Sequence, residues 1–86
     1  MIAAGLAQAL ERVLREVAET LFLKWTRVDP TTRSHTALAH FYQSRPDRIP
    51  DAESAYRAAI GSASSQEIAE AYRKLANFLY VVGRAS

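Results

Sequence analysis

The stretch Ser65–Gly83, SQEIAEAYRKLANFLYVVG, has the period of an amphipathic helix. Hydrophobic side chains recur there in steps of three and four, the spacing that brings side chains to one face of a helix. These residues are Ile68, Tyr72, Leu75, Leu79 and Val82. Polar side chains recur with the same steps on another face, at Glu70, Arg73, Asn77 and Tyr80. We therefore predict a helix with one face in a core and the other exposed or against a partner.

Three segments before this stretch also have a helical period. The first is the longest, and Asp29-Pro30 ends it because a residue before proline avoids the α region. Thr31 or Thr32 can cap the second helix, and Pro50 suits the first turn of the third. The predicted helices span residues 2–27, 33–44, 50–60 and 65–82. No segment alternates with a period of two, so we expect an all-α fold of four helices in a single domain over residues 1–86.

Composition excludes several classes of protein. The chain of 86 residues has no cysteine, so it has neither disulfides nor thiolate metal ligands. No hydrophobic run approaches the roughly 20 residues of a membrane span, and a cytoplasmic protein is the expectation. His35 and His40 lie five positions apart, about 140° around a helix, and cannot share a metal ion by local geometry. Without a nucleophile motif or a phosphate loop, we expect no enzyme, no metal and no cofactor.

The charged residues mostly pair with one another at helical spacing. Glu11 with Arg15, and Arg15 with Glu19, are examples within the first helix. The net charge is only +2. One segment, from Lys24 to Arg48, is locally basic, but nucleic-acid binding requires a denser stripe of positive charge.

Two patterns recur along the chain. Ala18-x3-Phe22 returns as Ala52-x3-Tyr56, which lies 34 residues further on, counting from Phe22 to Tyr56. His35-x2-Leu38-Ala39-x2-Tyr42 returns as Tyr72-x2-Leu75-Ala76-x2-Leu79, which lies 37 residues further on, counting from Leu38 to Leu75. Periods of this size are typical of stacked helical repeats.

The two patterns resemble the B helix and the A helix of the tetratricopeptide repeat (TPR). The resemblance implies an antiparallel helix-turn-helix stack in the order B, A, B, A, with a long first helix. It also implies a groove lined by the A helices that binds a polypeptide. The groove residues would be Arg33, Thr36, His40, Gln43, Glu70, Arg73, Asn77 and Tyr80. Arg73-x3-Asn77 is similar to half of the carboxylate clamp of chaperone-binding members.

On this phasing each end of the stack lacks a neighbouring helix, and repeat stacks need covered ends. We therefore expect a hydrophobic contact with a partner protein or a second copy. Its residues would be Leu21, Trp25, Phe78, Val81 and Val82. In the alternative arrangement, the first helix folds back over the fourth and closes a monomer.

The function predicted from the sequence is non-enzymatic protein–protein interaction, as an adaptor, chaperone or assembly subunit. Two alternatives stay open. One is a structural subunit that self-associates through its long first helix. The other is a small nucleic-acid-associated subunit that uses the segment from Lys24 to Arg48.

Overall fold

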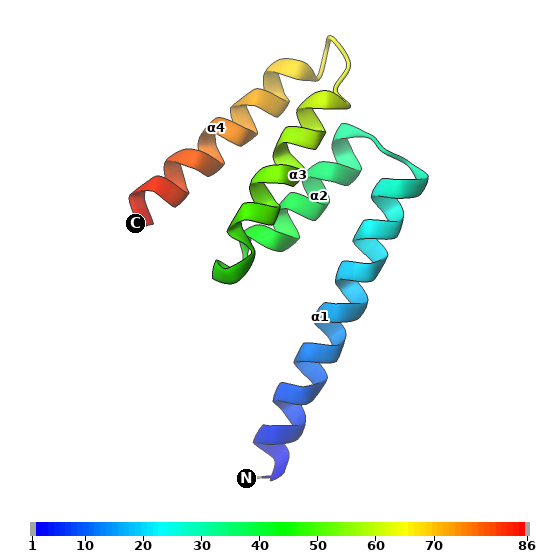
Figure 1. Ribbon diagram of the computed structural model, residues 1–86, viewed down its shortest axis with the longest axis vertical. Coiled ribbons are helices and arrows are strands. Elements are labelled where there is room, and N and C mark those ends of the chain that lie inside the picture. Colours follow the sequence, from blue (N-terminus) through cyan, green and yellow to red (C-terminus); the bar gives the residue numbers. More distant parts are fainter. Residues whose placement is uncertain (1, 86) are drawn as a thin grey trace.

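The computed structural model describes residues 2–85, with side chains from residue 5 to residue 83, and confirms the all-α fold. Four α-helices and one short 3-10 helix follow one another, without a strand in this part of the chain (Figure 1). Their bounds are α1 Ile2–Val28, α2 Thr32–Gln43, η1 Pro46–Arg48, α3 Ile49–Gly61 and α4 Ile68–Ala85.

Local hydrogen bonds explain where two of the helices begin. The Thr31 hydroxyl accepts from the Ser34 backbone N–H (3.2 Å), and the Ser34 hydroxyl accepts from the Thr31 N–H (3.1 Å). This reciprocal capping box fixes the start of α2 and selects Thr31 over Thr32, the two caps that the sequence left open. Before α4, the Glu67 carboxylate accepts from the Ser64 N–H (3.0 Å). Residues 65–67 form a turn there, so α4 begins three residues later than predicted.

The helices form one layer, in which α2 and α3 are central and α1 and α4 are at the two edges (Figure 1). Helix α1 packs against α2, and α4 packs against α3. The layer measures 52 × 34 × 15 Å, and its radius of gyration is 14.9 Å. A compact chain of this length would have a radius of about 12 Å. The alternative in which the first helix covers the fourth is wrong, because α1 and α4 lie on opposite sides of the α2–α3 pair.

The core lies between α2, α3 and α4. Its buried residues are Leu38, Ala39, Tyr42, Ala52, Ala55, Tyr56, Leu75 and Phe78. The alanines let the helices approach closely, and the aromatic rings fill the remaining space. The rings of Tyr56 and Phe78 lie 5.0 Å apart between their centroids, which joins α3 to α4.

The buried face of α4 differs from the one that the sequence predicts. Leu75 is buried, but Tyr72 is 57% exposed and Leu79 is 41% exposed. Ala71 and Phe78 are buried instead, which rotates the buried face by roughly 40° about the helix axis. The reason is that α4 packs mainly against α3, which covers only one sector of a helix that is hydrophobic over a wider arc.

Candidate functional site: a groove between α2 and α4

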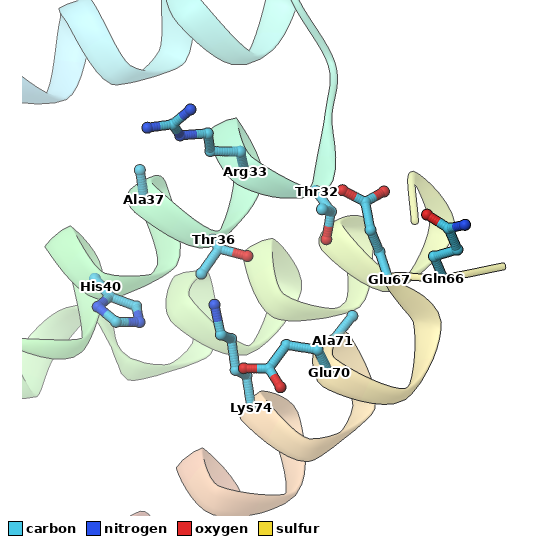
Figure 2. Close-up of a pocket in the computed structure, with 10 residues that line it drawn as sticks. All are labelled: Thr32, Arg33, Thr36, Ala37, His40, Gln66, Glu67, Glu70, Ala71 and Lys74. Carbon is cyan, nitrogen blue, oxygen red and sulfur yellow. The ribbon is translucent and has the colours of Figure 1, made fainter. Parts of the chain in front are cut away.

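A groove with a volume of about 690 Å³ lies between α2 and α4. Figure 2 shows Thr36 and His40 on the α2 side, with Glu70 and Lys74 across from them on α4. The residues that line it are Thr32, Arg33, Thr36, Ala37, His40, Gln66, Glu67, Glu70, Ala71 and Lys74. Ala37 and Ala71 have no side chain beyond Cβ, so they leave space in the groove unfilled.

Half of the groove residues predicted from the sequence line this groove. Arg33, Thr36, His40 and Glu70 do so. The other four do not line it: Gln43, Arg73, Asn77 and Tyr80. Gln43 accepts a hydrogen bond from the Tyr56 hydroxyl. Three of the four residues predicted on α2 line the groove, but only one of the four predicted on α4 does, because the groove side of α4 lies about a quarter turn from the predicted polar face.

Lys74 is one of the six groove residues that the sequence did not predict, and its side chain is basic. It comes between the predicted positions Arg73 and Asn77, and the rotation of α4 brings it to face α2 (Figure 2). A signal was present, because Lys74 lies four positions after Glu70, which does line the groove. The spacing of three or four places both residues on one side of a helix.

The acidic groups of the groove already have partners. The backbone N–H of Ser64 donates to Glu67 and lowers the pKa of that carboxyl group. The Arg73 guanidinium binds Glu70 on the same helix and lowers the pKa of Glu70. Both carboxylates are therefore charged at neutral pH. Arg33 and Lys74 form no hydrogen bond or ion pair with another described side chain, although the charge of Lys74 also helps to lower the pKa of Glu70.

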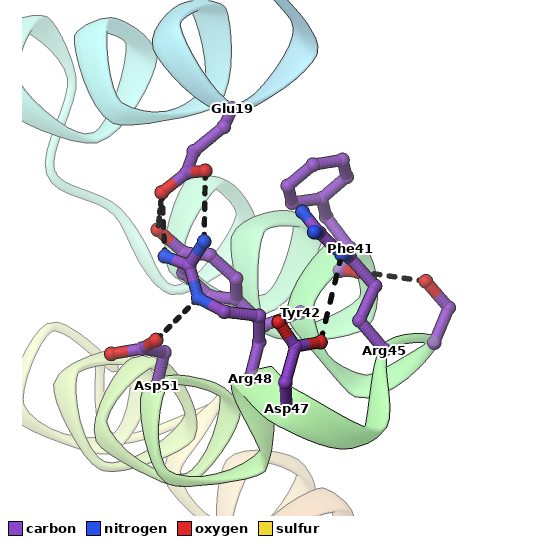
Figure 3. Close-up of polar contacts among 8 residues, drawn as sticks. Glu19, Phe41, Tyr42, Arg45, Asp47, Arg48 and Asp51 are labelled. Atoms are coloured by element: carbon purple, nitrogen blue, oxygen red, sulfur yellow. Dashed lines mark hydrogen bonds and ion pairs between the residues drawn. The ribbon is translucent and has the colours of Figure 1, made fainter. Parts of the chain in front are cut away.

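A second polar cluster lies at the junction of α1, α2 and α3 (Figure 3). Arg48 binds both carboxylate oxygens of Glu19, at 3.0 and 2.6 Å, and its Nε donates to Asp51 (2.6 Å). The Tyr42 hydroxyl donates to Glu19 (2.8 Å), and the Arg48 guanidinium lies 4.5 Å from the centre of the Tyr42 ring. This cluster ties α1 to the rest of the fold.

The same cluster perturbs its own pKa values. The hydrogen bond from Arg48 lowers the pKa of Glu19. Burial, helped by the bond to Glu19, raises the pKa of Tyr42 to about 12. Within the cluster, Arg48 and Tyr42 both bind Glu19, which holds α1 against α2 and η1.

The cluster also weakens the nucleic-acid alternative. Arg48 is bound by two carboxylates, and Arg45 lies 4.0 Å from Asp47. Two of the arginines in the basic segment are thus paired with carboxylates within the chain, which leaves fewer free cations for the dense positive stripe that nucleic-acid binding needs.

The five residues predicted to form a hydrophobic contact lie in three environments. Leu21 is 62% exposed and Val81 is 47% exposed. Trp25 is 36% exposed and stacks on Phe22, while Val82 packs against the core. Phe78 is only 2% exposed. Its assignment to a contact surface is therefore corrected to a core residue, because its ring fills the space beside Tyr56.

Residues 2–85 show neither a metal-binding cluster nor a membrane-spanning helix. No group of three or more His, Asp or Glu side chains is placed to hold a metal ion there. Among the helices described, none is both long and hydrophobic enough to cross a membrane.

Comparison with known proteins identifies no relative. The chain matches no protein family model, no curated protein and no solved structure. The function must therefore be argued from the groove and from the exposed faces of the helices.

Proposed function

We propose that this chain is a small, non-enzymatic, TPR-like interaction module that binds an acidic segment of a partner polypeptide in the groove between α2 and α4. The observation that carries this proposal is the pair Arg33 and Lys74, two cations without an ion-pair partner that line the same groove from different helices. A groove of about 690 Å³ lies within the usual range for binding sites.

The packing of α2 supports the repeat-like part of the proposal. Leu38, Ala39 and Tyr42, the signature positions of the first A-type helix, are buried. The equivalent positions of α4 are only partly covered, since Leu75 is buried while Leu79 is 41% exposed. The difference follows from the layer: α2 has a neighbour on both sides, and α4 has one on a single side.

The chemistry of the groove favours carboxylates as ligands. Arginine offers a planar fork of donors and lysine offers a compact ammonium group, and both bind carboxylates through charge-assisted hydrogen bonds. Thr36 and His40 add hydroxyl and imidazole groups on the α2 side, which can bind a peptide backbone.

Fluorescence polarisation with labelled decapeptides tests the proposal. Peptides rich in Asp and Glu should bind, and matched peptides with Asn and Gln should bind more weakly. The double variant Arg33→Glu/Lys74→Glu should lose at least about tenfold in affinity for the acidic peptides. The matched control Lys24→Glu/Arg27→Glu changes the same charges at exposed α1 positions outside the groove, and should bind as the original chain does. Equal binding of acidic and neutral peptides, or equal losses in both variants, would overturn the proposal.

A further inference from the structure

Helix α1 has an uncovered hydrophobic stripe in addition to the face that packs on α2. Six large hydrophobic side chains form it, and each is at least half exposed. They are Leu6, Leu10, Val13, Leu14, Val17 and Leu21. The stripe runs for about 22 Å along the helix. A contiguous exposed hydrophobic surface of this size on a small protein marks an interaction site.

The stripe is separate from the contact with α2. The face toward α2 carries Ala18 and Phe22, which are partly buried. At about 100° per residue, the centre of the stripe lies roughly 110° away around the helix axis. The first half of α1 also extends beyond the other helices (Figure 1). A second helix can therefore lie along the stripe without displacing α2.

The chain exposes more surface than a compact protein of its mass. Its exposed area is 6170 Å², whereas a compact protein of 9.6 kDa exposes about 5,100 Å². The excess of about 1,000 Å² is spread over the whole flat layer, and the stripe on α1 is one part of it. Since a standard interface buries roughly 800 Å² of each partner, the chain has enough uncovered surface for one.

The stripe has the same pattern in both directions along the helix. Its midpoint lies between Val13 and Leu14, and two further pairs lie at equal distances from it: Leu10 with Val17, and Leu6 with Leu21. A two-fold interface requires this property, because residue i of one copy meets residue j of the other while j meets i. Two antiparallel copies of α1 would place hydrophobic side chains opposite hydrophobic side chains along the whole stripe.

The charged residues in this part of α1 keep clear of the stripe. At about 100° per residue, Glu11 and Glu16 lie roughly 110° from the centre of the stripe, one on each side of it. Arg12 and Arg15 lie roughly 150° from the centre, close to the opposite side of the helix. The stripe therefore has a hydrophobic surface without charges inside it.

We infer that the α1 stripe binds the α1 stripe of a second copy of this chain, in antiparallel orientation. The antiparallel arrangement places the two folded bodies at opposite ends of the helix pair and opposes the two helix dipoles. The first half of α1 extends beyond the other helices of its own chain (Figure 1). In the dimer it would pack against the second half of the α1 of the other copy. This inference does not depend on the groove.

Light scattering over a range of concentrations tests the inference. The chain should have twice the mass of 9.6 kDa. In the variant Leu10→Glu/Val17→Glu, the dissociation constant of the dimer should rise at least about 100-fold. Its helix content by circular dichroism should stay the same, because both side chains are exposed in the single chain. The matched control Leu79→Glu/Val81→Glu changes exposed hydrophobic residues of α4 and should leave the dimer intact.

Single cysteines test the orientation, since the chain has no cysteine of its own. Leu14→Cys lies beside the midpoint and should form a disulfide between copies on mild oxidation. Leu6→Cys alone should not form one, because the two sulfurs would be about 22 Å apart along the axis. Mixed with a Leu21→Cys chain, it should cross-link.

Three results would overturn the inference. A monomer at all concentrations would remove the interface altogether. A cross-link between two Leu6→Cys chains would indicate parallel helices. Dissociation by the Leu79→Glu/Val81→Glu control would instead place α4 in the contact, in a head-to-tail stack that has no closed symmetry.

Discussion

The contact between Glu19 and Arg48 gives the sharpest test of how α1 is held. It joins residues 29 positions apart through two hydrogen bonds, at 3.0 and 2.6 Å. The two side chains are 21% and 25% exposed. A pair of this kind lies between exposed ion pairs, which contribute about 0.2–1 kcal/mol, and buried pairs, whose disruption costs about 3–5 kcal/mol. Allowing for screening by solvent, we expect a coupling energy of about 1–2 kcal/mol.

A double-mutant cycle measures this coupling. The variants are Glu19→Gln, Arg48→Met and both together, and the free energy of unfolding is measured in urea. The pair Glu70 and Arg73 is the control, because it is an ion pair within one helix with exposed side chains (51% and 72%). Its coupling should be clearly smaller than that of Glu19 with Arg48.

The coupling should also depend on pH. Arg48 lowers the pKa of Glu19 in the folded state, so the contribution is present above the unfolded-state pKa of about 4.3. It is lost as the pH falls through the lowered folded-state value. Additive effects of the two substitutions at pH 7, or the same coupling at pH 7 and at about pH 2, would refute the assignment of Glu19 as the ionic anchor of α1.

Three further predictions concern the core and the helix cap. The original chain should lose stability between about pH 10 and pH 12, because burial raises the pKa of Tyr42 to about 12 and favours the neutral phenol in the folded state. Tyr42→Phe should make this loss smaller by up to about 2 kcal/mol. Urea unfolding of both chains at the two pH values checks this. Phe78→Ala should cost about 3–4 kcal/mol in urea unfolding, since it removes the ring packed on Tyr56, and a cost below about 1 kcal/mol would contradict the core assignment. Ser34→Ala should lower the free energy of unfolding by about 1–2 kcal/mol, because the buried hydroxyl donates to the Asp29 carbonyl oxygen (2.7 Å) and belongs to the cap of α2. An unchanged thermal midpoint would contradict this.

The helices could be predicted from the sequence because their signals are local. Pro30 and Pro50 mark boundaries through backbone sterics alone, and Thr31 caps α2 through a bond within three residues. The orientation of α4 about its axis is not local. Its hydrophobic residues cover a wide arc, and the position of α3 selects the sector with Phe78 over the sector with Tyr72.

The partner of Glu19 could not be predicted for the same reason. Arg15 lies four positions before Glu19, the spacing of a pair on one helix. The structure pairs Glu19 with Arg48 instead, because the docking of α1 on α2 brings η1 close to it. The groove is an intermediate case: the α2 residues follow from helical period, whereas Lys74 depends on the rotation of α4.

The two proposed surfaces can be occupied at the same time, because they lie on different parts of the fold. Helices α1 and α4 lie at opposite edges of the layer (Figure 1). The stripe belongs to α1, whereas the groove lies between α2 and α4. Pairing through α1 would therefore leave the groove of each copy open. A dimer would present two equivalent acidic-peptide sites. A partner whose linker lets two acidic segments reach both grooves would bind the dimer about 100-fold or more tightly than a partner with one acidic segment. The Leu10→Glu/Val17→Glu variant should abolish this gain without changing the affinity of a single decapeptide, which separates the two surfaces in one experiment.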